Sequence, residues 1–272
     1  MLNFEILCVT MGQKDFSKIQ QMNIHSNVVF ANQADECSYN EVEFENHKAK
    51  MITTTTRGVG KNRNIALIHA SADICLFADD DVVYNDDVEK VVTDEFTAHP
   101  DADIIIFHFD TDGTGRKQKK YPVTKKHGRF SPMPWGGVRI AVRLESIKKA
   151  NVWFSTLFGG GCVFPSGEDS MWLLECKRKG LTFYVSKETI GKISFAQSSW
   201  FTGYDERFYF GKGAFYQALH PKSVYLWMLY FAFRTKSFGN MRFGEKMKCM
   251  QLGRQGYDNM LNFDELREKQ RE

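Results

Sequence analysis

A short apolar run that ends in three consecutive aspartates constrains this chain more than any other feature. Residues 74–78 read ICLFA, and Asp79, Asp80 and Asp81 follow directly. A continuous apolar run of this length is typical of a strand buried on both faces. Three like charges at its end repel one another unless a positive group joins them. The run predicts a site for Mg²⁺ or Mn²⁺, which prefer hard oxygen ligands. The alternative is an acidic strand end that only favours the next helix.

Similar apolar runs flank this strand, with helical patterns between them. Strands are expected at 4–10, 27–31, 50–54 and 103–109, and helices at 14–22, 61–70 and after Asn85, the expected N-cap. This alternation predicts an α/β fold with a doubly wound, mostly parallel sheet. Ligands on such sheets bind beyond the carboxyl ends of the strands. Thr10, Asn32 and the aspartates are therefore expected to converge at one edge.

The remainder of the chain is less regular. A polar, basic segment at 110–134 precedes a strand at 136–143 and a helix at 144–150. A glycine-rich loop at 153–167 leads to a helix at 168–179 and a strand at 181–185. An aromatic loop is expected at 198–213 and a helix at 221–234. We expect one domain over 1–215 and a C-terminal helical extension over 216–272.

Composition indicates a globular protein inside the cell. Of 272 residues 43% are hydrophobic, and the net charge of +3 is too small to indicate a nucleic-acid partner. The six cysteines form no CxxC pair and are expected to be reduced. No signal peptide or membrane span is apparent. The apolar residues and scattered basic residues of 221–254 either pack as core or touch a membrane, which would place the protein at its inner face.

Two further motifs carry candidate chemistry. In residues 57–64, RGVGKNRN, glycines precede a helix, and Arg63 is expected either to reach a nucleotide or to lie on a solvated helix start. In residues 166–169, SGED, Asp169 suits a capping box with Ser166. A carboxylate held there also suits a general base, because the preceding run of glycines, 159–161, allows the backbone to approach a ligand.

Three blocks of sequence together resemble family-2 glycosyltransferases with the GT-A fold, closest to bacterial enzymes of capsule and other surface polysaccharides. The blocks are RGVGKNRNIAL, ICLFADDDVVY and FGGGCVFPSGEDSMWLLECKRKG, in that order. The resemblance covers about residues 4–215. It departs from the family where Asn32 and Gln33 stand in place of a nucleoside-binding aspartate. A late metal-binding histidine and the QxxRW motif of processive synthases are missing too.

The resemblance implies a role for each matching position. Asp169 would be the catalytic base, and Asp81 with Asp79 would hold Mn²⁺ or Mg²⁺. Tryptophans would line the acceptor side, namely Trp135 and Trp200. The implied contacts to the donor nucleotide and sugar are Thr10, Asn32, Arg63, Asp79, Asp80, Gly160, Gly161 and Glu168.

The function expected on this basis is inverting transfer of a sugar from a nucleotide diphosphate, most simply a UDP-sugar, to a glycan acceptor. That acceptor could be lipid-linked. Two alternatives remain open: a non-catalytic subunit that only binds sugar nucleotides, and a sugar nucleotidyltransferase. The first would bind donor without turnover, and the second would release pyrophosphate instead of a nucleoside diphosphate.

Overall fold

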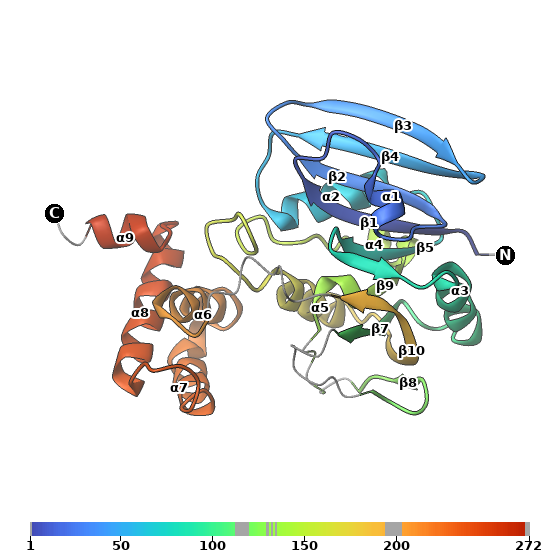
Figure 1. Ribbon diagram of the computed structural model, residues 1–272. Coiled ribbons are helices and arrows are strands. Elements are labelled where there is room, and N and C mark those ends of the chain that lie inside the picture. Colours follow the sequence, from blue (N-terminus) through green and yellow to red (C-terminus); the bar gives the residue numbers. More distant parts are fainter. Residues whose placement is uncertain are drawn as a thin grey trace. The chain divides into compact units, whose positions relative to one another are not determined.

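The computed structural model describes residues 2–111, 120–128, 131, 133, 135–193 and 203–269 (Figure 1). The chain divides into two compact units. Residues 1–155 and 169–198 form the first, here called the sheet unit. Residues 156–168 and 199–272 form the second, here called the helical unit. The predicted boundary after residue 215 lies within a helix of the second unit, Glu206–Leu219, and the functional division into 1–215 and 216–272 stays a prediction.

The sheet unit is built on one ten-stranded sheet of mixed direction. Four strands run parallel in the order β4 (His47–Thr54), β2 (Asn27–Gln33), β1 (Phe4–Met11) and β5 (Ile74–Asp79). On the far side of β5 follow β9 (Ile140–Arg143), β7 (Ile104–Thr111), β10 (Phe183–Ile193) and β6 (Val82–Tyr84). Antiparallel pairs join β9 to both neighbours and β6 to β10, while β10 runs parallel to β7. The mostly parallel sheet expected from the sequence is confirmed.

Two apolar layers cover the two faces of this sheet, as expected for a doubly wound fold. Alternate residues of a strand point to opposite faces. In β1, Phe4 and Ile6 therefore pack with α3 (Val88–Ala98), whereas Leu7 packs with the layer under the helices on the other face. Those helices are α2 (Val59–His69), α4 (Leu144–Ala150) and α5 (Glu168–Arg178).

Two strands differ from the sequence-based expectation. Residues 38–44 form β3, an edge strand antiparallel to β4, although no strand was expected there. Its side chains are nearly all exposed, so its sequence carries no apolar alternation to reveal it. The strand expected at 181–185 is β10, which continues to Ile193 and also pairs with β8 (Lys125–Lys126). The strand expected at 136–143 begins only at Ile140, after a 3₁₀ turn over Gly137–Arg139.

The helix expected at 14–22 and the cap expected for α3 were wrong in detail. Only Lys18–Gln21 is helical, and this single turn is α1. The N-cap of α3 is Asp87. Asn85 instead uses its side-chain amide to bond the carbonyl of Thr189, at 3.0 Å, which fixes β6 to β10.

The helical unit packs α6 (Glu206–Leu219), α7 (Val224–Arg234) and α8 (Phe243–Asn259) around a small core, with α9 (Phe263–Lys269) at the chain end. The aromatic loop expected at 198–213 was wrong over 206–213, which belongs to α6. Glycines there permit close helix packing: a Cβ on Gly213 would lie 1.9 Å from the carbonyl oxygen of Met250 in α8. The helix expected at 221–234 is confirmed as α7, preceded by a 3₁₀ turn at Pro221–Ser223.

Within the described ranges, no helix has both the length and the apolar character needed to cross a membrane. All six cysteines are free, and Cys8, Cys75, Cys176 and Cys249 are buried.

Candidate active site

The carboxyl ends of four parallel strands bring the predicted polar residues to one edge of the sheet unit. Thr10 of β1 lies opposite Asn32 of β2, and Asn32 lies opposite Thr53 of β4. On the other side of β1, Val9 lies opposite Asp79 of β5. The expected convergence of Thr10, Asn32 and the aspartates is therefore confirmed by the strand register.

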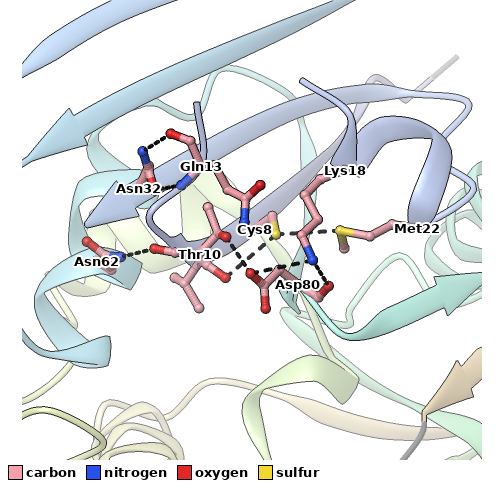
Figure 2. Close-up of polar contacts among 9 residues, drawn as sticks. Cys8, Thr10, Gln13, Lys18, Met22, Asn32, Asn62 and Asp80 are labelled. Atoms are coloured by element: carbon pink, nitrogen blue, oxygen red, sulfur yellow. Dashed lines mark hydrogen bonds and ion pairs between the residues drawn. The ribbon is translucent and has the colours of Figure 1, made fainter. Parts of the chain in front are cut away.

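Asp80 is held by two side chains from the first strand and first helix. The hydroxyl of Thr10 donates a hydrogen bond to its carboxylate. Lys18 of α1 donates to the backbone carbonyl of Asp80 at 3.0 Å, and its ammonium lies 3.8 Å from the carboxylate oxygen Oδ2 (Figure 2). The Lys18 side chain is only 19% exposed, so this cation sits close to the aspartates with limited screening by water.

Arg63 joins the aspartate triplet to Asp169. This guanidinium, 3% exposed, donates one bond to Asp169 and a second to Oδ1 of Asp79 at 3.2 Å. The other carboxylate oxygen of Asp169 accepts the backbone N–H of Gly137 at 2.8 Å. Two carboxylates that are 90 residues apart in the chain are thus bridged by one buried cation.

The start of α2 explains how an arginine comes to be buried here. Gly58 adopts φ +121°, a conformation that only glycine takes without strain. The backbone of Gly60 fits so closely that a Cβ would lie 2.1 Å from the carbonyl oxygen of Ser155. Asn62, fully buried, donates to the carbonyls of Thr10 and Ala31 at 3.3 and 2.9 Å. These contacts exclude the solvated helix start considered for this motif.

Asn32 is fully buried and supports the turn after β1. Its amide nitrogen donates to the carbonyl of Gln13, and its oxygen accepts the Gln13 N–H at 3.1 Å (Figure 2). The amide nitrogen also donates to the hydroxyl of Thr53. The neighbouring Gln33 accepts the N–H of Gly58 at 2.8 Å. Asn32 therefore acts on the shape of the turn, and its direct contact with a nucleoside stays a prediction.

Burial and mutual repulsion raise the pKa values of two of the three aspartates. Burial raises the pKa of Asp79; Arg63 opposes this, and Asp169 and Asp80 add to it. Partial desolvation, followed by the charges of Asp79 and Asp80, raises the pKa of Asp81. Among the described residues, no side chain pairs with Asp81, which is exposed. The edge thus holds more negative charge than Arg63 and Lys18 neutralise.

This donor set fits a divalent cation that takes most of its ligands from a substrate. Within the described part of the chain, no three His, Cys, Asp or Glu side chains are grouped so as to enclose a metal ion. Mg²⁺ is commonly held by one or two carboxylates while phosphate and water oxygens complete its shell. Asp81, with Asp79 beside it, offers that number of ligands.

Comparison with known proteins bears on the same region. Residues 31–150 match the model of glycosyl transferase family 2. This part of the chain is similar to family-2 glycosyltransferases. The comparison with curated protein sequences gave no match.

Solved structures of S. aureus TarS share the fold. The TarS 1–349 structure in complex with UDP-GlcNAc has 13% sequence identity and a TM-score of 0.61, covering 96% of this chain and 93% of that chain. The TarS 1–349 structure in complex with UDP has the same identity and coverage and a TM-score of 0.60. A longer TarS structure, 14% identical, matches with a TM-score of 0.54 and covers 97% of this chain and 44% of that chain. Because the sequence identities are low, the structural similarity to TarS establishes the GT-A fold alone.

The remaining predicted residues belong to other parts of the chain. Gly160, Gly161 and Glu168 belong to the helical unit. Gly160 has open space where a Cβ would be, and buried Glu168 accepts the N–H of Gly167 at 3.0 Å. Trp135 is partly buried against the sheet unit and stacks edge-on against His127. Trp200 lies outside the described residues.

Sequence reasoning missed Lys18 and Gly137. Lys18 comes from the first turn of helix after β1, and its 62-residue separation from Asp80 leaves no pattern to read. Gly137 was included in a strand. A Cβ there would lie 2.6 Å from the Arg63 guanidinium, so the Gly136–Gly137 pair is the one signal that a buried group approaches the backbone at this point.

Proposed function

We propose that this protein is an inverting glycosyltransferase that moves a hexose or N-acetylhexosamine from a UDP-sugar to an acceptor hydroxyl in surface polysaccharide assembly. The bridge that Arg63 makes between Asp79 and Asp169 supports this proposal most strongly. It holds a carboxylate suited to proton transfer beside carboxylates suited to a metal and diphosphate. The fold shared with TarS, which has been solved with UDP-GlcNAc, favours a uridine nucleotide as donor.

Asp169 is the proposed base. Its carboxylate is oriented by Arg63 on one oxygen and by the Gly137 N–H on the other, while the side chain remains 17% exposed. Each carboxylate oxygen has two lone pairs, so an acceptor hydroxyl can still donate to it. As the hydroxyl oxygen attacks the anomeric carbon, its proton passes to Asp169. The bond from that carbon to the diphosphate oxygen breaks on the opposite face, which inverts the configuration.

The aspartate triplet serves the donor in this proposal. Asp81 and Asp79 would hold Mn²⁺ or Mg²⁺, which when bound supplies positive charge beside the leaving diphosphate. Asp80, oriented by Thr10 and Lys18, would lie next to the ribose and diphosphate. Lys18 itself adds a fixed positive charge at the same edge, an electrostatic contribution that needs no rearrangement during the reaction.

A donor panel tests the reaction. The purified protein is incubated with UDP-, GDP- and other sugar nucleotides, with Mn²⁺ or Mg²⁺, and the released nucleotide is identified. We expect UDP release that a chelator abolishes. Asp169→Asn should lower turnover by about 10² to 10⁴ while the donor still binds, because the variant lacks the proton acceptor.

Asp101→Asn is the matched control, since Asp101 is a carboxylate of the same unit that pairs with Lys126 at the surface. It should retain full activity. Undiminished turnover in Asp169→Asn would disprove the assigned base. Donor binding without any nucleotide release would favour the non-catalytic subunit, and pyrophosphate release would favour the nucleotidyltransferase.

A lipid-linked acceptor is part of the proposal and is tested separately. The described helices include none that could span a membrane. In this proposal the contact with such an acceptor, at the inner face of a membrane, is peripheral. Transfer to an acceptor presented in vesicles, compared with the same acceptor in detergent, measures whether the bilayer contributes. Equal rates in the two forms would argue against a membrane-located reaction.

A further inference from the structure

Helix α7 of the helical unit exposes an unusually apolar face to solvent. Five large side chains form it, here called the α7 face: Tyr225, Leu226, Leu229, Tyr230 and Phe233. Leu226 and Phe233 are 69% and 66% exposed. The opposite side of the helix already packs into the core of the helical unit through Val224, Met228 and Ala232. The exposed side chains are therefore surplus to what the fold of this unit requires.

Neighbouring aromatic residues extend the α7 face. Phe243, 37% exposed at the start of α8, packs on Phe233 with ring centroids 4.9 Å apart. Trp227, 38% exposed, stacks on His220 at 4.7 Å. Contiguous apolar surface of this kind is unfavourable in water and marks a site that binds another apolar surface.

Positive charge surrounds this apolar surface. Between residues 216 and 254 the chain has seven lysine and arginine residues, of which Lys246 is buried, and a single acidic residue, Glu245. Lys222 precedes α7, Arg234 ends it, and Lys236 and Arg242 follow, and all four are exposed. Glu245 offsets only one of these charges; its carboxylate accepts the Arg242 N–H at 2.6 Å at the start of α8.

A cleft at the amino end of α7 places cationic and apolar groups together. It has a volume of about 290 Å³, and its lining includes Lys222, Tyr225, Leu226 and Arg254. Arg254 also lies over the Tyr225 ring, 5.7 Å from its centroid, and its charge is paired with Asp258 at 3.0 Å, which leaves Lys222 as the unneutralised cation among the described residues of the cleft. Positive groups at the border of an apolar surface match the two layers of a lipid surface, which presents anionic headgroups outside its acyl chains.

We propose that the α7 face is a membrane-binding surface that lies flat on an anionic bilayer. The helix has 11 residues, about 16 Å at 1.5 Å per residue, which suits an interfacial position and is too short to span. Tyrosine and tryptophan at its margins suit the headgroup level. Pairing of this face with a second copy is disfavoured, because a two-fold interface would bring the same basic residues of both copies together.

Vesicle co-sedimentation tests the proposal with the full chain. Vesicles of phosphatidylcholine containing phosphatidylglycerol should bind the protein, and vesicles of phosphatidylcholine alone should bind it much less. The double variant Leu226→Gln/Phe233→Gln should lower binding at least about tenfold, because it removes the two most exposed apolar side chains. Lys222→Gln and Lys236→Gln should each lower binding about fivefold, an effect that added salt should mask.

Ile68→Gln is the matched control, because Ile68 is an equally exposed apolar residue, at 61%, on α2 of the sheet unit. It should leave vesicle binding unchanged. Absence of binding to anionic vesicles, or equal binding by the double variant, would overturn the proposal. A wild-type dimer that the double variant converts to monomer would assign the face to self-association instead. Vesicle binding involves no sugar transfer, so its failure would leave the proposed reaction standing.

Discussion

Replacement of Arg63 by methionine is expected to destabilise the sheet unit by about 3 kcal/mol at neutral pH. Methionine keeps most of the apolar contact with Phe154, whose ring centroid lies 5.3 Å from the guanidinium carbon. It removes two charge-assisted hydrogen bonds, to Asp79 and Asp169, each worth about 1.5 to 3 kcal/mol. The remaining side chains of Asp79 and Asp169 are 33% and 17% exposed, so their hydration reduces the destabilisation.

The loss should depend on pH in a defined direction. Burial already raises the pKa of Asp79 above its ordinary value, and Arg63 is the largest influence that lowers it. Without Arg63 the folded-state pKa rises further, while the unfolded value stays the same. The folded variant then binds a proton more tightly than the unfolded chain. Destabilisation is therefore greatest above the raised pKa and shrinks as the pH falls toward the ordinary range of aspartate.

Urea unfolding at two pH values, about 7.5 and about 5, measures this effect through the midpoint and slope. Arg57→Met is the matched control, because Arg57 pairs with the fully exposed Asp35 and is itself 45% exposed. It should cost less than about 1 kcal/mol and show no added pH dependence. A cost for Arg63→Met below about 1 kcal/mol, or one that grows as the pH falls, would refute the bridging role of Arg63.

Three further outcomes follow from the same structure. Gly60→Ala should lower the free energy of unfolding by about 2 kcal/mol or more, because the new Cβ would lie 2.1 Å from the Ser155 carbonyl oxygen. Gly244→Ala in α8, where the Cβ has open space, should be neutral or stabilising by up to about 1 kcal/mol. Thermal unfolding compares the two variants, and equal effects would contradict the close approach at Gly60. Mn²⁺ affinity, measured by calorimetry, should fall as the pH is lowered. The fall should begin at a higher pH than at an ordinary aspartate site, because the pKa of Asp81 is raised. A pH-independent affinity would exclude Asp81 as a ligand. Thr10→Val should lower the free energy of unfolding by about 1 kcal/mol, since Asp80 keeps Lys18 as a partner. Adding Asp80→Asn to that variant should lower the free energy of unfolding little further. Fully additive losses would show that Thr10 and Asp80 do not interact.

The sequence permitted prediction of those elements whose side chains are buried in a regular pattern. Strands β1, β2 and β5, which carry Thr10, Asn32 and Asp79, were found because each is a largely apolar run. Edge strand β3 was missed because its exposed residues, SYNEVEF, carry no such run. The first part of helix α6, residues 206–213, was taken for part of an aromatic-rich loop. In the structure Gly213 allows α6 to approach α8 closely, and this reason is visible only once α8 is in place.

The candidate site was predictable in its residue types and less so in its pairing. Four charged residues of the site were identified because they occur where a charged side chain is unusual. They are Asp79, Asp81, Arg63 and Asp169. Which carboxylate would pair with which cation depends on side-chain reach across the sheet edge, and spacing along the chain does not determine it. The contribution of Lys18 could not be read for the same reason.

The pairings divide the triplet into three unequal positions. Asp80 is engaged by Thr10 and Lys18, and Asp79 is engaged by Arg63, whereas no described side chain pairs with Asp81. A cation at Asp81 would displace only water and any bound proton. A cation that also used Asp79 would compete with Arg63 for the same carboxylate. Because Arg63 bonds Asp169 as well, binding of metal and donor at the triplet would alter the charge felt by the proposed base, which couples the two ends of the site through a single guanidinium.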